Sequence, residues 1–275
     1  MDWVKRLGSR AGRDPWRNDF PLMADLPGEM TLDCEEVRLP VHPMLALRIR
    51  VFIDWHAEVG RIVGVIPPVD TEARELFDRL GLTGAGGEGG SVVLPVTRLT
   101  DSTAVETVAE RVRELLEYEM TDIAELGAAC YMAVSELCGN AVEHGRSVGG
   151  FQYVAAARFT EPRRRVSIAI GDLGIGIPGH LRQQEPELAD DDFAIARAME
   201  PRVSGTGHPH RGNGFTETFE AALTSTLHAA RIQVYSGNGV VQREIVQENP
   251  RIELFPAANR RQGTWITYDL VSASG

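Results

Sequence analysis

The chain has 275 residues, a formal net charge of −11, 43% hydrophobic residues and 24% charged residues. This composition is typical of a soluble globular protein, and the length suits one large domain or two small ones. The negative charge argues against a protein that binds nucleic acid by neutralising its phosphates, and against docking on an anionic membrane surface.

The amino-terminal segment and the cysteines bear on where the protein resides. Charged residues run through residues 1–20, which hold no apolar stretch and so do not resemble a signal peptide. No apolar run approaches the roughly 18 residues that a membrane-spanning helix needs. Cys34, Cys130 and Cys138 show no paired spacing, which favours small buried thiols. We therefore expect a reduced, cytoplasmic protein.

The first hundred residues fall into two parts. Residues 1–35 are polar, rich in arginine and punctuated by glycine and proline, and they are expected to form a loose arm. Residues 36–100 alternate between strand and helix patterns and predict a small α/β subdomain, in which Asp70 opens the second helix and Gly81 closes it. The strands are expected at residues 36–41, 61–68 and 91–96, and the helices at residues 44–60 and 70–82.

Residues 101–275 predict a second domain of the α+β class. Its first helix is capped by Asp101 or Ser102, and its second ends at Gly145. The sequence Gly-Asn-Gly at residues 237–239 is a strong hairpin signal. We expect a two-layer sandwich, in which helices cover one face of a mixed, mostly antiparallel sheet. The helices are expected at residues 101–120, 122–145, 191–199 and 215–226, and the strands at residues 150–160, 164–172, 231–236, 240–248 and 263–270.

A row of polar side chains interrupts the apolar helix expected at residues 122–145. Glu136, Asn140 and His144 are four residues apart, and this spacing drifts by only about 40° around a helix, so all three lie on one flank. Glu143 falls on the same flank. A partly exposed helix face can have this pattern without any function, so the row alone does not indicate a site.

Three further stretches could contribute to a binding site. Asp172 ends an apolar strand and could present a carboxylate to the amino group of a ligand, while Gly174 and Gly176 would let the backbone pass close to it; an Asx turn has the same pattern. Residues 211–214, Arg-Gly-Asn-Gly, open a helix whose exposed N–H groups favour phosphate. Thr264 begins the last strand, where threonine is also an ordinary β-former.

In this order the stretches resemble the motifs of the GHKL superfamily of ATPases, which includes gyrase-type enzymes, heat-shock chaperone ATPases, sensor histidine kinases and mismatch-repair ATPases. That family has an N box on a helix, a DxGxG turn, a GxG turn before a helix and a final GT strand. The resemblance covers about residues 103–271 and implies ATP and Mg²⁺ as cofactors. Here the motifs read Glu136-xxx-Asn140, Asp172-x-Gly174-x-Gly176, Gly212-x-Gly214 and Gly263-Thr264.

The resemblance implies a role for each of the polar residues. Asn140 would be a ligand of Mg²⁺, because an amide oxygen suits a hard cation. Glu136 would act as the general base toward the oxygen that attacks the γ-phosphate, which belongs to a water or a hydroxyl. Asp172 would accept a hydrogen bond from the adenine amino group, with Thr264 assisting.

The resemblance also implies which residues line the nucleotide. The glycines of the DxGxG turn would contact the adenine. The glycines of the GxG turn would contact the phosphates, together with an arginine in place of a lysine, since Lys5 is the only lysine. Residues 178–211 would form a mobile lid over ATP. Besides Asn140, Asp172 and Thr264, the expected ATP-binding residues are Gly174, Gly176, Ile177, Arg211, Gly212 and Gly214.

The pattern ExxxNAxxH, with a histidine after the asparagine, looks most like the anti-sigma-factor serine kinases and their relatives. Histidine kinases need a separate helix pair that carries the phosphorylated histidine, and none is evident before residue 100. The gyrase, chaperone and mismatch-repair branches carry an aspartate at the place of Glu143, and some need a lysine from a following domain. His144 could cap the helix end or orient Glu136, and a structural role is equally compatible.

Three functions are open on this basis. The first is a kinase that uses Mg²⁺ and ATP to phosphorylate Ser or Thr on a small partner protein, such as a STAS-like antagonist or a sigma-like factor. The second is a slow ATPase or ATP-sensing module whose lid state controls partner binding. The third is a clamp ATPase that works through dimerisation, which the lack of a downstream domain disfavours. A homodimer is compatible with each of them.

Two features are not explained by the ATPase motifs. The strand–helix–strand pattern of residues 36–100 vaguely resembles STAS-type domains, so this part is either a fused or mimicked partner-binding module or a packing extension. His208 and His210 have no carboxylate or cysteine at ligand spacing, which favours a solvated loop over a metal site.

Overall fold

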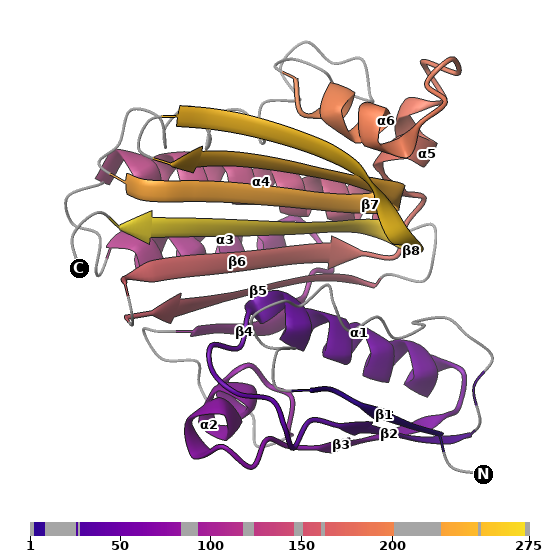
Figure 1. The fold of residues 1–275 in the computed structure, drawn as a ribbon, viewed down its shortest axis with the longest axis vertical. Helices are drawn as coiled ribbons and strands as arrows, with labels where there is room; N and C mark the ends of the chain where they lie inside the picture. The colour runs from indigo at the N-terminus through magenta and orange to yellow at the C-terminus, as the bar shows by residue number, and fades with distance from the viewer. Residues whose placement is uncertain are drawn as a thin grey trace. The chain divides into compact units, whose positions relative to one another are not determined.

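The computed structural model divides the chain into two compact units, residues 1–96 with 155–157, and residues 97–154 with 158–275 (Figure 1). We refer to them as the small unit and the large unit. The structure describes residues 3–8, 26, 28–83, 93–117, 124–145, 151–160, 163–200, 227–246 and 249–272.

The small unit is built on a three-stranded parallel sheet with the order β1-β2-β3. Met30 and Leu32 of the central strand are buried, whereas Glu29 is exposed and Thr31 is half-buried, as expected for a sheet with one covered face. The strands are β1 (Trp3–Arg6), β2 (Glu29–Asp33) and β3 (Ile62–Ile66), and the helices are α1 (Pro43–Glu58) and α2 (Thr71–Arg79).

Local capping chemistry fixes both helices of the small unit. The α1 helix begins where the His42 ring nitrogen accepts a hydrogen bond from the backbone N–H of Met44, at 3.0 Å. The α2 helix begins where Asp70 accepts from the N–H of Ala73, at 2.9 Å. Gly81 has a φ of 83° just after α2, the conformation that a glycine allows at a helix end. The predicted boundaries of α2 are therefore confirmed.

Two expectations for the amino-terminal part were wrong. The segment expected to be a loose arm, residues 1–35, contains β1 and β2. Residues 36–41, expected to form a strand, instead follow a turn in which Asp33 accepts a hydrogen bond from the N–H of Glu35 and the Cys34 carbonyl accepts from Val37. The strand begins seven residues upstream of this segment, in β2, where burial alternates from Glu29 to Leu32.

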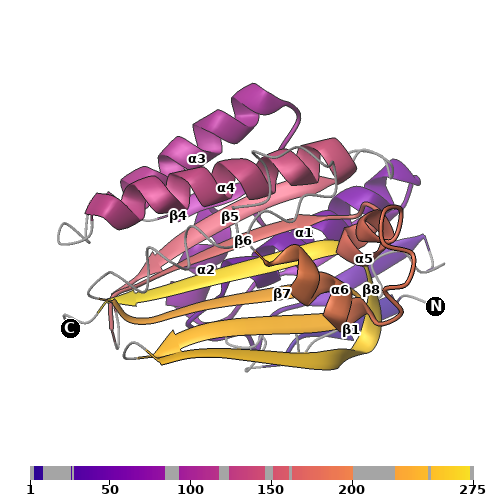
Figure 2. The ribbon, with the colours of Figure 1, turned by 90° about the horizontal axis from the view of Figure 1, so that it is seen from above.

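A five-stranded sheet has the order β4-β5-β6-β8-β7, in which β6–β8 and β7–β8 are antiparallel. Its β6, β7 and β8 strands belong to the large unit, whereas residues 93–96 of β4 and 155–157 of β5 are grouped with the small unit. Figure 2 shows α3 and α4 side by side over one face of this sheet. Together with the small parallel sheet, this confirms the predicted fold class. The elements are β4 (Val93–Arg98), α3 (Ser102–Glu117), α4 (Ala124–Gly145), β5 (Gln152–Phe159), β6 (Arg165–Asp172), α5 (Gly176–Leu181), α6 (Asp191–Ala198), β7 (Leu227–Val246) and β8 (Asn249–Ser272).

The long β7 element turns back on itself where the sequence predicts a hairpin. Arg231 forms an ion pair with Glu244, at 2.5 Å, and the side chain of Gln233 donates to that of Gln242, at 2.5 Å. These contacts join positions that lie symmetrically about residues 237–238, so the two halves of β7 face each other as in a hairpin.

The α3 and α4 helices pack through apolar faces. Asp101 accepts a hydrogen bond from the N–H of Ala104 at 2.9 Å and caps α3, as expected. Cys130 and Cys138 are buried in α4, and Cys34 is buried in the small unit; all three are free thiols, as expected. Burial raises the pKa of Cys130 to about 12, which makes its thiol unreactive at neutral pH.

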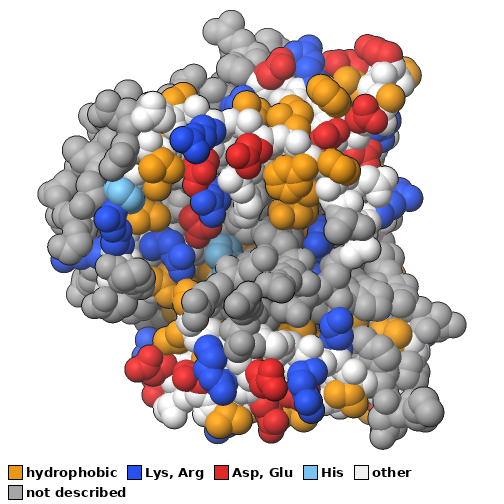
Figure 3. Space-filling view, in the orientation of Figure 1, with side chains coloured by type: hydrophobic (Ala, Val, Ile, Leu, Met, Phe, Trp, Pro, Cys, Tyr) orange, Lys and Arg blue, Asp and Glu red, His pale blue; other side chains and the backbone are white. Residues whose placement is uncertain are grey.

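On the surface, acidic and basic side chains of the described residues are interspersed over the face seen in Figure 3. Within the described part of the chain, none of the helices combines the length and the apolar character needed to cross a membrane.

Candidate functional site

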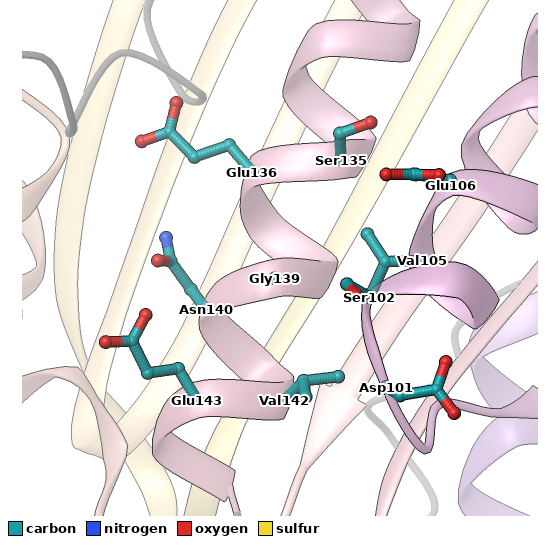
Figure 4. A pocket seen from close by; sticks show the side chains of 10 residues that line it. All are labelled: Asp101, Ser102, Val105, Glu106, Ser135, Glu136, Gly139, Asn140, Val142 and Glu143. Carbon is teal, nitrogen blue, oxygen red and sulfur yellow. The ribbon is translucent and has the colours of Figure 1, made fainter.

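The polar row predicted on α4 lies along one flank of the helix. Figure 4 shows Glu136, Asn140 and Glu143 projecting from the same side. Glu136 and Asn140 are half-buried and Glu143 is exposed, whereas Leu137 and Cys138 are buried. The four-residue spacing therefore does place the acid and the amide together, at the border between the core and solvent.

A hollow of about 570 Å³ lies between α3 and α4 and includes this flank. Four of its lining side chains are carboxylates. Their shared negative charge would repel a phosphate, so an anionic ligand could approach only with a cation that screens it. Its lining residues are Asp101, Ser102, Val105, Glu106, Ser135, Glu136, Gly139, Asn140, Val142 and Glu143.

The second group of predicted residues lies where β6 ends beside β8. The pairing of Gly171 with Trp265 brings Asp172 next to Thr264. The Asp172 carboxylate accepts a hydrogen bond from the backbone N–H of Gly174, at 2.7 Å, and another from the backbone N–H of Thr264. Two of the predicted motifs, about ninety residues apart in the chain, are thus joined through one carboxylate.

Burial has a strong effect on this carboxylate. It raises the pKa of Asp172 to about 7, because the charged form loses its hydration, and the hydrogen bonds from Gly174 and Thr264 offset only part of that cost. A buried carboxylate with such a pKa is either an energetic cost that the fold tolerates or a group retained to bind a ligand.

Two glycines make the close approach between these motifs sterically feasible. Gly263 has a φ of 76°, and a methyl group on it would overlap the backbone carbonyl of Asp172. Gly176 has a φ of 77°, and a methyl group there would lie 2.5 Å from the Ser236 hydroxyl oxygen. Any other residue at either position would push the turn away from the strand.

Sequence reasoning missed two residues that hold this turn. The Ser236 hydroxyl accepts a hydrogen bond from the N–H of Ile177, at 3.0 Å, and donates to the carbonyl of Gly263, at 2.8 Å. The Gln262 amide donates to the carbonyls of Leu173 and Gly174, at 3.1 and 2.7 Å. Ser236 precedes the Gly-Asn-Gly hairpin and Gln262 precedes the Gly-Thr pair, but nothing local marks either as a partner of the turn.

The first part of the predicted lid is held by several contacts. Arg182 forms an ion pair with Asp191, at 2.7 Å, and Asp191 accepts from the backbone N–H of Asn238, at 2.6 Å. Gly237 and Gly239 give Asp191 room, because a methyl group on either would overlap the start of α6. A lid that moved as one piece from residue 178 onward would have to break these contacts.

The remaining predicted residues are not described by the structure. Arg211, Gly212 and Gly214, the residues expected to contact phosphate, lie outside the described residues, as do His208 and His210. The backbone of His144 lies in α4, but its side chain is not described. The structure therefore gathers the site residues into two groups, the α4 flank and the Asp172 turn, and Asp172 and Thr264 do not line the α3–α4 hollow.

Among the described residues, His, Cys, Asp and Glu side chains do not gather in threes as a protein-only metal site would require. By sequence, the chain matches no protein-family model and no curated protein. A solved structure of the B subunit of DNA gyrase from Myxococcus xanthus is similar at 9% identity with a TM-score of 0.28, over 61% of this chain and 44% of that one. The match thus spans less than half of the gyrase chain, and a TM-score this low carries no inference about function.

Proposed function

We propose that the large unit binds ATP with Mg²⁺ and transfers the terminal phosphoryl group to a hydroxyl of a small partner protein. The observation that carries the proposal is the junction at Asp172, where the carboxylate accepts from Gly174 and Thr264. The sequence motifs predict that Asp172, Gly174 and Thr264 lie around one adenine, and their contact supports the proposal.

The Asp172 carboxylate suits an adenine amino group. An ionised carboxylate offers about four lone-pair sites, and the two backbone N–H groups occupy two of them. An amino group that donates to a remaining site would favour the charged form, and so would offset the cost of burial that now raises the pKa of Asp172. Gly176, which cannot bear a side chain here, keeps the turn close to the strand.

The α4 flank would serve the phosphate end. Asn140 would hold Mg²⁺ through its amide oxygen, because this ion takes oxygen ligands and leaves several positions for water and phosphate. Glu136, one helical turn earlier, would take the proton from the attacking hydroxyl. Bound ATP would supply the phosphoryl group and leave as ADP, and Mg²⁺ would neutralise charge on the phosphates. The acidic hollow around this flank makes the cation a requirement for phosphate to approach.

We further propose that the partner is a protein that carries the accepting Ser or Thr, and that the small unit contributes to recognising it. Support for a kinase comes from the sequence pattern ExxxNAxxH and from the half-buried Glu136, which lies on the same flank as Asn140. The slow ATPase and the ATP-sensing module are the alternatives that an experiment must separate.

Calorimetry and labelled ATP test the proposal. We expect Asn140→Ala to abolish ATP binding in the presence of Mg²⁺, and Glu136→Ala to retain binding but lose turnover. Met132→Ala is the matched control, because Met132 is exposed on the same helix and should not affect either property. Unchanged ATP affinity in Asn140→Ala would refute the site.

Incubation with γ-labelled ATP and candidate partner proteins then separates the functions. Label on a Ser or Thr of a partner supports the kinase, whereas free phosphate alone supports the ATPase. Tight binding with neither product leaves the sensing module.

A further inference from the structure

The β3 strand forms a border of the small parallel sheet (Figure 1). Among the described residues, β3 pairs with β2 alone. Ile62 is 67% exposed and Ile66 is 39% exposed, although both are large apolar residues. An uncovered border strand with exposed apolar side chains is a place where another strand can add.

The direction of the backbone groups in β3 follows from its pairing. The N–H of Ile62 and the carbonyl of Ile66 both bond to the β2 side, at 2.9 Å each. In a parallel pair the residues of one parity direct both backbone groups to the same neighbour. Residues 62, 64 and 66 are therefore satisfied by β2, and Val63 and Val65 direct their N–H and carbonyl groups outward.

The β3 strand reads the same in both directions, Ile62-Val63-Gly64-Val65-Ile66. A two-fold axis through Gly64 would therefore place Ile62 opposite Ile66 of a second copy, and Val63 opposite Val65. These valines are the residues whose backbone groups point outward, and directly opposed residues of this kind exchange both hydrogen bonds in an antiparallel pair. The symmetry of the sequence and the outward direction of the Val63 and Val65 backbone groups therefore favour the same register, with Gly64 opposite Gly64 of the second copy.

We infer that β3 is the pairing surface for a second copy of this chain, in antiparallel register about Gly64. The occupant is another β3 because the strand carries no charge and is complementary to itself in both shape and hydrogen bonding. The isoleucines of the two copies would cover one another on the exposed face, and the two small sheets would become one continuous sheet.

The β1 strand, at the opposite border of the same sheet, carries charged side chains. The β1 strand carries Lys5 and Arg6, and Arg6 forms an ion pair with Asp33 at 2.8 Å. Charged residues on a border strand oppose pairing with another chain. One border of the sheet is thus protected by charge, and the other, β3, is not.

A cysteine at the two-fold axis tests the register directly. In this pairing the residues at position 64 form a non-hydrogen-bonded pair, with Cα atoms about 4.5 Å apart, which lies within the range of a disulfide. Gly64 tolerates a side chain, because a methyl group there would meet its nearest atoms only at 3.8 and 3.9 Å. We expect Gly64→Cys to form a disulfide-linked dimer on mild oxidation.

The matched control is Val4→Cys, on the exposed face of β1, which should remain monomeric on a non-reducing gel. The three native cysteines are buried and should not interfere. Equal cross-linking of both variants would overturn the inference, since it would reflect random collision.

Charge substitutions test the pairing without a covalent bond. An interface this small should be weak, so sedimentation of the full chain should cover about 1 to 300 µM. We expect Ile62→Lys/Ile66→Lys, which opposes like charges across the axis, to weaken the dimer at least about tenfold. Ile62→Lys/Ile66→Glu opposes unlike charges in the same register and should restore it.

Circular dichroism shows whether each variant is folded before its association is compared. A monomeric wild-type chain at the highest concentration would overturn the inference. So would a dimer that persists in the lysine pair, or folded variants in which the lysine–glutamate pair associates no better than the lysine pair. ATP binding is measured separately and does not depend on this result.

Discussion

Replacing Asp172 by asparagine should make the large unit more stable at neutral pH while it weakens nucleotide binding. Asparagine has nearly the same shape, and its Oδ1 can still accept from the N–H groups of Gly174 and Thr264. The substitution removes only the charge that burial disfavours. The change in stability therefore reports the cost of ionising this carboxylate.

The size and sign of the effect follow from the pKa of Asp172. Its folded value of about 7 lies above its ordinary value of 3.8, because burial disfavours the charged form. The folded state binds the proton of Asp172 more tightly than the unfolded state. The resulting stabilisation is complete below about pH 4 and is lost as the pH rises through 7. The full difference corresponds to about 4 kcal/mol, so the variant should exceed the wild type by about 2 to 4 kcal/mol at pH 8.

Urea denaturation at intervals from pH 4 to pH 8 measures this difference. Trp265 is buried in β8 next to Thr264, so tryptophan fluorescence, to which Trp3, Trp16 and Trp55 also contribute, includes a signal from this part of the chain. Glu253→Gln is the control, because it removes one charge from an exposed position in β8. If the stability of Asp172→Asn ran parallel to the wild type across this pH range, the buried carboxylate would not be the source of strain.

Two further substitutions test the contacts around the turn. Gly263→Ala should lower the free energy of unfolding by well over 2 kcal/mol, since it combines a positive φ with an overlap at the Asp172 carbonyl. The control is Gly81→Ala, which has a φ of 83° but open space around it and should cost only about 1 to 2 kcal/mol. Equal losses of stability in urea denaturation would contradict the close approach. Ser236→Ala should cost about 1 to 3 kcal/mol, because it leaves the Ile177 N–H and the Gly263 carbonyl without their partner. A loss below about 0.5 kcal/mol would show that other groups replace the hydroxyl.

Elements with local signals were predictable from the sequence. The α2 and α3 helices have an aspartate cap and an amphipathic face within one short window, so no distant contact was needed to recognise them. The β1 strand is different, since its four residues become a strand only through pairing with β2, more than twenty residues away. A strand of four residues is also too short to show a periodic pattern of its own.

The candidate site divides in the same way. Asp172 and Gly176 belong to a turn whose glycine spacing is visible in the sequence, and Asn140 lies in a helix with a clear four-residue row. Ser236 and Gln262 act on that turn from another part of the chain, and their roles depend on the register of β7 and β8. A serine before a hairpin has no feature that distinguishes a structural partner from an ordinary surface residue.

The pKa of Asp172 links stability to function in a way that the other contacts do not. A carboxylate buried with a pKa of about 7 is destabilising at neutral pH, and asparagine would provide the same backbone hydrogen bonds without that cost. A purely structural Asx turn has no need of the charge. The charge is useful when a ligand donates a hydrogen bond to the carboxylate, because that bond stabilises the ionised form. The free energy that ionisation costs the empty turn is then offset in the complex with the ligand. If ATP is that ligand, it should stabilise the wild type more than Asp172→Asn, and it should do so most at high pH.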